Sequence, residues 1–243
     1  MVNIRRLASP IDLPFRGQRS LSTPTKVKKT SEFIKHGSPY EQLHRFFIGL
    51  IPAQSAINAI EFTEGAHIAY VQQLQLGEDK PEILNLVETS HQNIINLNEV
   101  FVSKKHIYFL YDSWGISLND IQELSPRLQL GEVEIATICK SILHGLDYMH
   151  NVLGVCHGNL SPSTVRITPD GVVKLADVGR SMIQGSGRLI KDKDIKALCR
   201  IVRDLLDLDN ARGIRGTMGF LAEDFTGVSS HVTVKDLLQV CPS

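Results

Sequence analysis

Residues 157–167, followed by residues 175–179, constrain the fold of this chain of 243 residues more than any other stretch. The polar, proline-containing start of this stretch is typical of a loop, and the β-branched residues at 165–167 predict a short strand. A Pro-Asp-Gly turn at 169–171 leads into a second predicted strand at 172–175. The stretch is therefore expected to form a loop and a hairpin that ends in an acidic turn.

The loop contains His157, Asn159, Ser161 and Thr164, and the acidic turn contains Asp177. Their spacing resembles the catalytic loop and metal-binding turn of the eukaryotic protein kinases, His-Arg-Asp-Leu-Lys-Pro-x-Asn followed by Asp-Phe-Gly. In that family the loop aspartate accepts the substrate proton, and the loop asparagine and the turn aspartate hold Mg²⁺. Here Asn159 replaces the aspartate, Ser161 the lysine and Thr164 the asparagine. Asp177 is the carboxylate that remains.

These replacements change the chemistry that the loop is able to perform. An amide does not take up a proton near neutral pH, so Asn159 is able to orient a hydroxyl but not to act as the base. Thr164 offers a poorer metal ligand than the amide carbonyl it replaces. The lysine that grips the phosphates in the family is replaced by Val71 in an ungapped match, or by Gln72 in a match shifted by one. We therefore expect no catalytic residue in the loop, and Asp177 is the one expected metal position.

Before the loop, alternating apolar residues predict the strands of a kinase small lobe. Strands are expected at 46–49, 56–62, 67–74, 97–102 and 106–111, and a helix is expected at 81–88. The resemblance assigns four positions to the binding of ATP, namely Gly49, Ala69, Glu82 and Asp112. Gly49 also fits a simple turn at the end of a strand, and Glu82 also fits a solvated carboxylate. Tyr111, at the back of the expected nucleotide pocket, would narrow it.

The large lobe is expected to begin with residues 118–123, followed by a long amphipathic helix at about 132–150. Asp194 opens a further helix and matches the family residue that hydrogen-bonds the catalytic-loop backbone. We therefore expect Asp194 to be structural and to brace the loop around His157. Fourteen residues separate the acidic turn from Asp194, and the family's Ala-Pro-Glu motif is absent. The platform for a peptide substrate is therefore expected to be missing. A last helix is expected at 233–239.

The predicted fold class is α+β, a bilobal protein kinase-like fold. The kinase-like domain is expected at 40–241, with a small antiparallel β lobe at about 40–111 and a shortened, mainly helical large lobe at about 115–241. Residues 1–39 contain eight Lys/Arg and two Asp/Glu and are rich in Ser, Thr and Pro, so they are expected to form a disordered basic tail. Residues 72–74 and 134–140 are most similar to the PAK subfamily of Ser/Thr protein kinases.

Composition limits the other classes of function. The four cysteines are widely spaced and form no Cys-x-x-Cys pair, which predicts free thiols in a reducing compartment. The apolar run at 46–53 is too short to span a bilayer. We expect a cytoplasmic location, with the nucleus as an alternative, and we expect a protein partner rather than nucleic acid.

These observations predict a pseudokinase, which is a catalytically inactive scaffold or regulatory binding protein in kinase signalling. Its expected partner is a protein such as an active kinase. No cofactor is then required. The alternative is a residual ATP-binding protein or weak Ser/Thr protein kinase that uses Asp177 and a divalent metal such as Mg²⁺. A third reading is a decaying paralogue or a faulty gene model with no selected function. A retained kinase fold does not show which of these three alternatives is correct.

Overall fold

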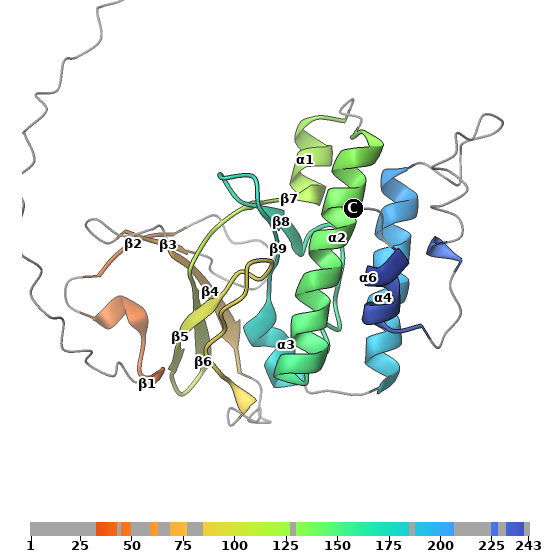
Figure 1. Cartoon of the computed structure of the whole chain (residues 1–243). Helices are drawn as coiled ribbons and strands as arrows, with labels where there is room; N and C mark the ends of the chain where they lie inside the picture. Colours follow the sequence, from red (N-terminus) through yellow and green to blue (C-terminus); the bar gives the residue numbers. More distant parts are fainter. Residues whose placement is uncertain are drawn as a thin grey trace, which may run out of the picture. The chain divides into compact units, whose positions relative to one another are not determined.

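A computed structural model places the chain in two units, Met1–Ser31 and Glu32–Ser243. The structure describes residues 33–42, 45–49, 59–62, 69–76, 85–126, 130–184, 188–206, 225–227 and 232–240. All of these residues belong to the second unit, in which a β-sheet lies beside a group of helices (Figure 1). This is the α+β arrangement that the sequence predicts.

The small lobe is a six-stranded sheet in the order β1-β5-β6-β4-β3-β2. Its strands are β1 (Ile34–His36), β2 (Phe46–Gly49), β3 (Ala59–Phe62), β4 (Ala69–Gln75), β5 (Leu97–Val102) and β6 (His106–Tyr111). Neighbouring strands are antiparallel except for β1 and β5, which are parallel. The predicted bounds of β2, β5 and β6 are confirmed. The strands expected at 56–62 and 67–74 appear as β3 and β4 in their described parts.

Strand β1 corrects the predicted boundary between the tail and the folded domain. It lies within residues 1–39, which were expected to be disordered, and pairs in register with Val100–Val102. Lys35 Nζ contacts Glu99 Oε1 at 2.6 Å and thereby links β1 to β5. A short 3-10 helix, η1 (Pro39–Glu41), follows. The ordered domain therefore begins before the predicted boundary at residue 40.

The helix expected at 81–88 is wrong in its described part. Residues 81–84, and with them Glu82, lie outside the described residues. Asn85 has 3-10 geometry, and residues 86–88 form no helix. Thr89 explains this extended path, because its hydroxyl accepts a hydrogen bond of 2.8 Å from the Leu97 backbone. The chain is therefore directed toward β5 instead of continuing a helical turn.

The second lobe consists mainly of helices. These are α1 (Leu118–Leu124), α2 (Glu132–Asp147), the π-helix η3 (Tyr148–Leu153), α3 (Val178–Gln184), α4 (Arg188–Leu205) and α6 (Val234–Val240). A small sheet accompanies them, made of β7 (Ile116–Ser117), β8 (Val165–Ile167) and β9 (Val173–Leu175). Of the helices described, none is both long and apolar enough to cross a membrane.

Local sequence explains where these helices begin and end. Ser117 caps α1, because its hydroxyl accepts from the Asp120 backbone while the Asp120 side chain accepts from the Ser117 backbone. The helix predicted at 132–150 changes to the wider η3 after Asp147 and ends at Gly154, whose φ of 71° is left-handed. Helix α4 begins at Arg188, six residues before Asp194, and α3 follows the acidic turn directly.

One face of α2 forms the centre of the core, with Ile142, Leu143 and Leu146 fully buried. Gly145 lets this helix approach the rest of the domain closely. A Cβ atom there would lie 2.9 Å from the Asn93 carbonyl oxygen and 2.9 Å from a methyl carbon of Leu175. Burying each large apolar side chain contributes about 1.5–3 kcal/mol. This packing holds the loop at 157–164 against the helical lobe.

Candidate functional site: the loop brace and the interlobe cavity

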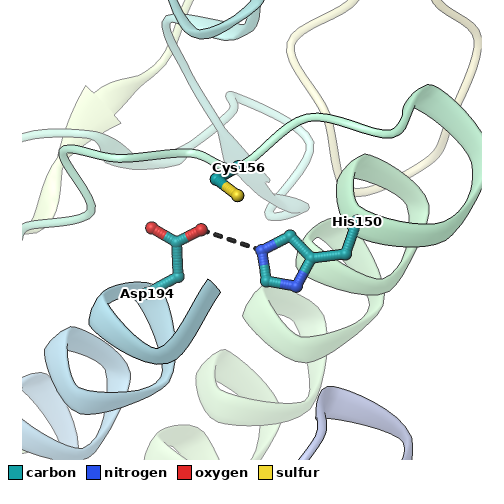
Figure 2. A group of neighbouring side chains, drawn as sticks. All are labelled: His150, Cys156 and Asp194. Carbon is teal, nitrogen blue, oxygen red and sulfur yellow. Dashed lines mark hydrogen bonds and ion pairs between the residues drawn. The ribbon is translucent and has the colours of Figure 1, made fainter. Parts of the chain in front are cut away.

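Asp194 lies under the loop and joins it to α4 (Figure 2). The side chain is 1% exposed, and its two oxygens accept hydrogen bonds of 2.8 Å from the backbone N–H groups of His157 and Gly158. His150 Nε2, at the end of the α2–η3 region, lies 2.8 Å from Asp194 Oδ2. These are the contacts expected of a residue that braces the loop. We refer to Asp194 and His150 with the two N–H groups as the loop brace.

Cys156 lies beside the brace, and its sulfur, the His150 nitrogen and an Asp194 oxygen all lie within 4.8 Å of one another (Figure 2). A cysteine, a histidine and an aspartate are possible zinc ligands. However, the 2.8 Å between His150 and Asp194 is a hydrogen-bond distance, whereas two ligands of one tetrahedral zinc lie about 3.3 Å apart at ordinary bond lengths. Both Asp194 oxygens also already accept backbone hydrogen bonds. We therefore assign this cluster to the support of the loop.

His157 is fully enclosed between the loop and the acidic turn. Its Nε2 lies 3.2 Å from the Ala176 carbonyl oxygen, and its Nδ1 accepts a hydrogen bond of 3.4 Å from the Asn159 backbone. This pattern requires a neutral ring with its proton on Nε2. Burial lowers the pKa of His157, and the Asp194 charge only partly offsets that effect. His157 therefore fixes the path of the loop as a neutral hydrogen-bonding group.

The remaining loop residues form contacts within the loop itself. Asn159 is exposed, and its backbone carbonyl faces the Thr164 hydroxyl at 3.3 Å. Thr164 is buried, and its hydroxyl also lies 3.0 Å from both the backbone N–H and the carbonyl of Ser161. These contacts use the Thr164 hydroxyl to close the loop on itself. A hydroxyl held in this way is not presented to a metal ion.

Gln72 occupies the position that faces the acidic turn. Its Nε2 donates a hydrogen bond of 3.1 Å to Asp177 Oδ1, and its Oε1 accepts one of 3.3 Å from the Tyr111 hydroxyl. Val71 points to the opposite face of β4, where it is buried with Phe101 and Leu110. Of the two matches, the one shifted by one residue thus places the replaced residue on the face of β4 that meets Asp177. The group at that position is a neutral amide.

Asp177 is half-buried, and its φ of 63° is left-handed, which aspartate tolerates better than most residues. Helix α3 begins at the next residue and brings Gly179 against the ring of Phe109. A Cβ atom at Gly179 would lie 2.5 Å from this ring, so the close packing requires glycine. The acidic turn is thus held against β4 by the hydrogen bond from Gln72 and against β6 by the close packing of Gly179 on Phe109.

A cavity of about 10 Å³ remains between the sheet lobe and the helical lobe. Its lining includes Tyr70, Tyr111, Trp114, Arg166 and Asp177. Such a volume holds about one water molecule. Tyr70 and Tyr111 stack with ring centroids 6.2 Å apart, and the Arg166 guanidinium donates a hydrogen bond of 2.9 Å to the Gly115 carbonyl. Large side chains from both lobes therefore fill this space.

The electrostatics of the cavity follow from this packing. Burial, with the nearby Asp177 charge, raises the pKa of Tyr70 to about 12, although Arg166 acts in the opposite direction. Burial likewise raises the pKa of Tyr111 well above its ordinary value. Both phenols are therefore neutral hydrogen-bonding groups. Among the lining residues described, Arg166 supplies the positive charge, and it comes from β8 rather than from β4.

The structure brings only part of the predicted nucleotide site together. Gly49 ends β2 opposite Ala59, and Ala69 begins β4 opposite Glu61; neither lines the cavity described above. Asp112 accepts hydrogen bonds of 2.9 and 3.0 Å from the backbone and side-chain amides of Asn96. That carboxylate supports the turn at 91–96. Asp177 does line the cavity.

Sequence reasoning missed Tyr70 and Arg166 as lining residues. A signal for Tyr70 was present, because residues two apart on a strand share a face. Once Gln72 is placed toward Asp177, Tyr70 must face the same space. No comparable signal exists for Arg166, since its direction depends on how the β8–β9 hairpin packs.

Comparisons with known proteins agree with this fold. A family model described as "Protein kinase domain" matches residues 67–196, which is more than half of the chain. The chain therefore belongs to the protein kinase domain family.

Individual relatives come from several kinase groups. The chain is 35% identical over 98 residues to rice cyclin-dependent kinase F-3, a match that covers 40% of this chain and 22% of the relative. It is 34% identical over 103 residues to the Drosophila serine/threonine-protein kinase Tao, covering 42% of this chain and 10% of that protein. It is 27% identical over 154 residues to rat serine/threonine-protein kinase PAK 5, covering 60% of this chain and 21% of that protein. The chain thus matches less than a quarter of the length of each of these three relatives.

Proposed function

We propose that this protein is a pseudokinase, a member of the kinase family that binds a protein partner and does not transfer phosphate. The observation that carries the proposal is the interlobe cavity, which has a volume of about 10 Å³ and is filled by Tyr70, Tyr111 and Arg166. Small-molecule sites in proteins measure about 300–1,000 Å³. Among the residues that the structure describes at this position, too little space is therefore left for ATP.

The polar groups near the cavity support the same proposal. The Gln72 amide cannot supply the charge that a lysine gives to nucleotide phosphates. Asn159 cannot accept a proton at neutral pH, and the Thr164 hydroxyl is engaged within the loop. Catalytic groups act as a unit, so losing several of them removes nearly all of the rate. Neither ATP nor Mg²⁺ is then required for function.

The partner that we propose is an active protein kinase, because a retained kinase surface is suited to contacts with other kinases. Within the family we place the chain nearest the PAK group. The support for this is that the match to rat PAK 5 extends over 60% of the chain, further than the matches to the rice and Drosophila kinases.

The test is the thermal unfolding midpoint with millimolar ATP, alone and with Mg²⁺ or Mn²⁺. A ligand that binds only the folded state must raise the midpoint. For a chain of this size 1 kcal/mol corresponds to about 2–4 °C, so we expect a shift below about 1 °C. An active Ser/Thr kinase serves as the positive control.

A metal-dependent rise that Asp177→Ala removes would instead support the alternative, a residual ATP-binding protein or weak kinase. Asp177 favours that alternative, because it keeps its carboxylate at the edge of the cavity. Transfer of labelled phosphate from ATP to a Ser/Thr peptide would then separate binding from activity.

A further inference from the structure

A groove of about 580 Å³ lies in the helical lobe, away from the interlobe cavity. It is bordered by α1, the start of α2 and the end of α4, which lie together at the top of Figure 1. Its apolar lining consists of Leu118, Ile121, Leu130, Ile135, Leu205 and Leu206. Unlike the interlobe cavity, this groove has the volume of a binding site. Covering apolar surface of this kind with another apolar group lowers the free energy of the system.

The rim of the groove is acidic in the part that the structure describes. Glu132, at the start of α2, and Asp204, near the end of α4, line it, and both side chains are exposed to solvent. Gln122 and Ser125 are neutral, and the lining residues that the structure describes include no Lys or Arg. The groove therefore combines an apolar floor with two carboxylates that face water.

This charge pattern indicates which kind of ligand the groove can bind. An anion would be attracted to the N-terminus of α2 by the helix dipole, but Glu132 and Glu134 already lie in that first turn. Carboxylates at a rim favour cationic partners and increase their rate of association. An apolar floor next to acidic groups thus fits a segment whose apolar side chains lie beside lysine or arginine.

We propose that this groove binds a short segment of a partner protein in which leucine-like side chains lie next to Lys or Arg. The inference rests on the proposed function, because it names the chemistry by which the pseudokinase recognises its partner. The apolar side chains enter the floor between α1 and α4, and the cations face Glu132 and Asp204. The interlobe cavity takes no part.

The probe is a fluorescein-labelled peptide of twelve residues that contains Arg-Arg-Ser-Leu-Gly-Leu within a Gly/Ser context. Two matched peptides replace both arginines by glutamate or both leucines by serine. Fluorescence anisotropy with the full chain measures affinity. We expect saturable binding of the first peptide and at least tenfold weaker binding of each of the other two.

Variants of the chain locate the site. Glu132→Lys/Asp204→Lys should weaken binding at least tenfold, and both positions are exposed, so folding should persist. Glu41→Lys/Glu88→Lys makes the same change of charge at two exposed positions of the small lobe and should leave the affinity unchanged. Circular dichroism melting shows whether each variant is folded. Equal weakening by both double variants would overturn the proposal, since charge alone would then explain binding.

Two further results would also overturn it. The first is the absence of saturable binding by the arginine-leucine peptide. The second is concentration-dependent dimerisation in analytical ultracentrifugation that Glu132→Lys/Asp204→Lys abolishes, because the groove would then receive a second copy of this chain. The nucleotide measurement is independent. ATP binding would contradict the pseudokinase reading without changing the peptide result, and failure of the peptide would leave the pseudokinase reading intact.

Discussion

The loop brace and the interlobe cavity differ in the contacts that hold them together. In the brace, Asp194 makes 2.8 Å contacts to the backbone of His157 and Gly158. In the cavity, Tyr70, Tyr111 and Arg166 line a space that holds about one water molecule, and Gln72 contacts Asp177 beside it. The brace is a network of hydrogen bonds to a buried carboxylate, whereas the cavity is filled by large side chains. The domain can therefore be stabilised by contacts that do not involve a nucleotide.

The largest expected effect comes from breaking the brace with Asp194→Asn. The substitution keeps the size of the side chain but turns one acceptor into a donor, which then faces the backbone N–H group of either His157 or Gly158. Removing one member of a buried charged network costs about 3–5 kcal/mol. Urea unfolding followed by circular dichroism measures the loss.

The control for this substitution is Asp204→Asn, which makes the same change at an exposed position of α4. We expect it to alter the free energy of unfolding by less than about 0.5 kcal/mol. Equal effects of the two substitutions would show that the brace contributes nothing beyond surface charge.

Opening the cavity is expected to have the next largest effect. Tyr70→Ala/Gln72→Lys removes the ring that fills the space and supplies an ammonium group beside Asp177. Loss of the buried ring should cost about 3 kcal/mol. In return, MgATP should raise the unfolding midpoint by about 2–4 °C, corresponding to about 1 kcal/mol of binding.

The matched control is Tyr108→Ala/Gln73→Lys, which alters the same residue types on the other face of the sheet, where Tyr108 packs in a separate cluster. It should lose stability without gaining a response to MgATP. If the Tyr70→Ala/Gln72→Lys variant is folded and also fails to respond, side chains filling the cavity are not what prevents nucleotide binding.

Sequence alone predicted the elements that local patterns define. Strands β5, β6 and β8 have the expected bounds because their β-branched and aromatic residues lie between clear turns. The position of Asp194 also followed from the loop motif. Strand β1 could not be found in this way, since Ile34–His36 lies in a basic stretch and gains its stability from pairing with β5, more than sixty residues away. Local composition does not predict pairing between strands that lie so far apart in the sequence.

The candidate site was predicted less completely than the fold. A shift of one residue in the match to the kinase motif changes the residue expected opposite Asp177 from Val71 to Gln72. The pairing of β4 with β6 in the structure resolves this choice. Arg166 enters the cavity because the β8–β9 hairpin packs next to Gly115. These positions depend on tertiary packing, which one sequence does not specify residue by residue. The roles expected for Gly49, Ala69 and Glu82 stay predictions.

The pH dependence of the unfolding free energy tests the role of His157 in the same loop, with a smaller expected effect. His157 has a lowered pKa in the folded state, so the unfolded chain binds a proton more readily. Its contribution to stability is fully present above the ordinary histidine pKa of about 6.5 and is lost as pH falls toward the folded-state pKa. One such group changes stability by at most about 1.4 kcal/mol per pH unit.

His157→Gln should therefore reduce the fall in unfolding free energy between pH 7 and pH 5, even though it lowers stability at pH 7. The control is His144→Gln at an exposed position of α2. An unchanged pH profile in His157→Gln would mean that the imidazole takes up a proton as readily in the folded protein as in the unfolded chain, which its contacts to Asn159 and Ala176 argue against.

The smallest effect is expected for Gln72→Leu, which removes the link between β4 and the acidic turn. The hydrogen bonds to Asp177 and Tyr111 are lost, and a typical hydrogen bond contributes about 1 kcal/mol. Leucine recovers part of that by burying more apolar surface, so the net loss should be about 1 kcal/mol in urea unfolding. Gln73→Leu, on the other face of β4, serves as the control. If Gln72→Leu is as stable as the natural chain, the Gln72 amide only fills space, and the orientation of Asp177 depends on the packing of Gly179 against Phe109.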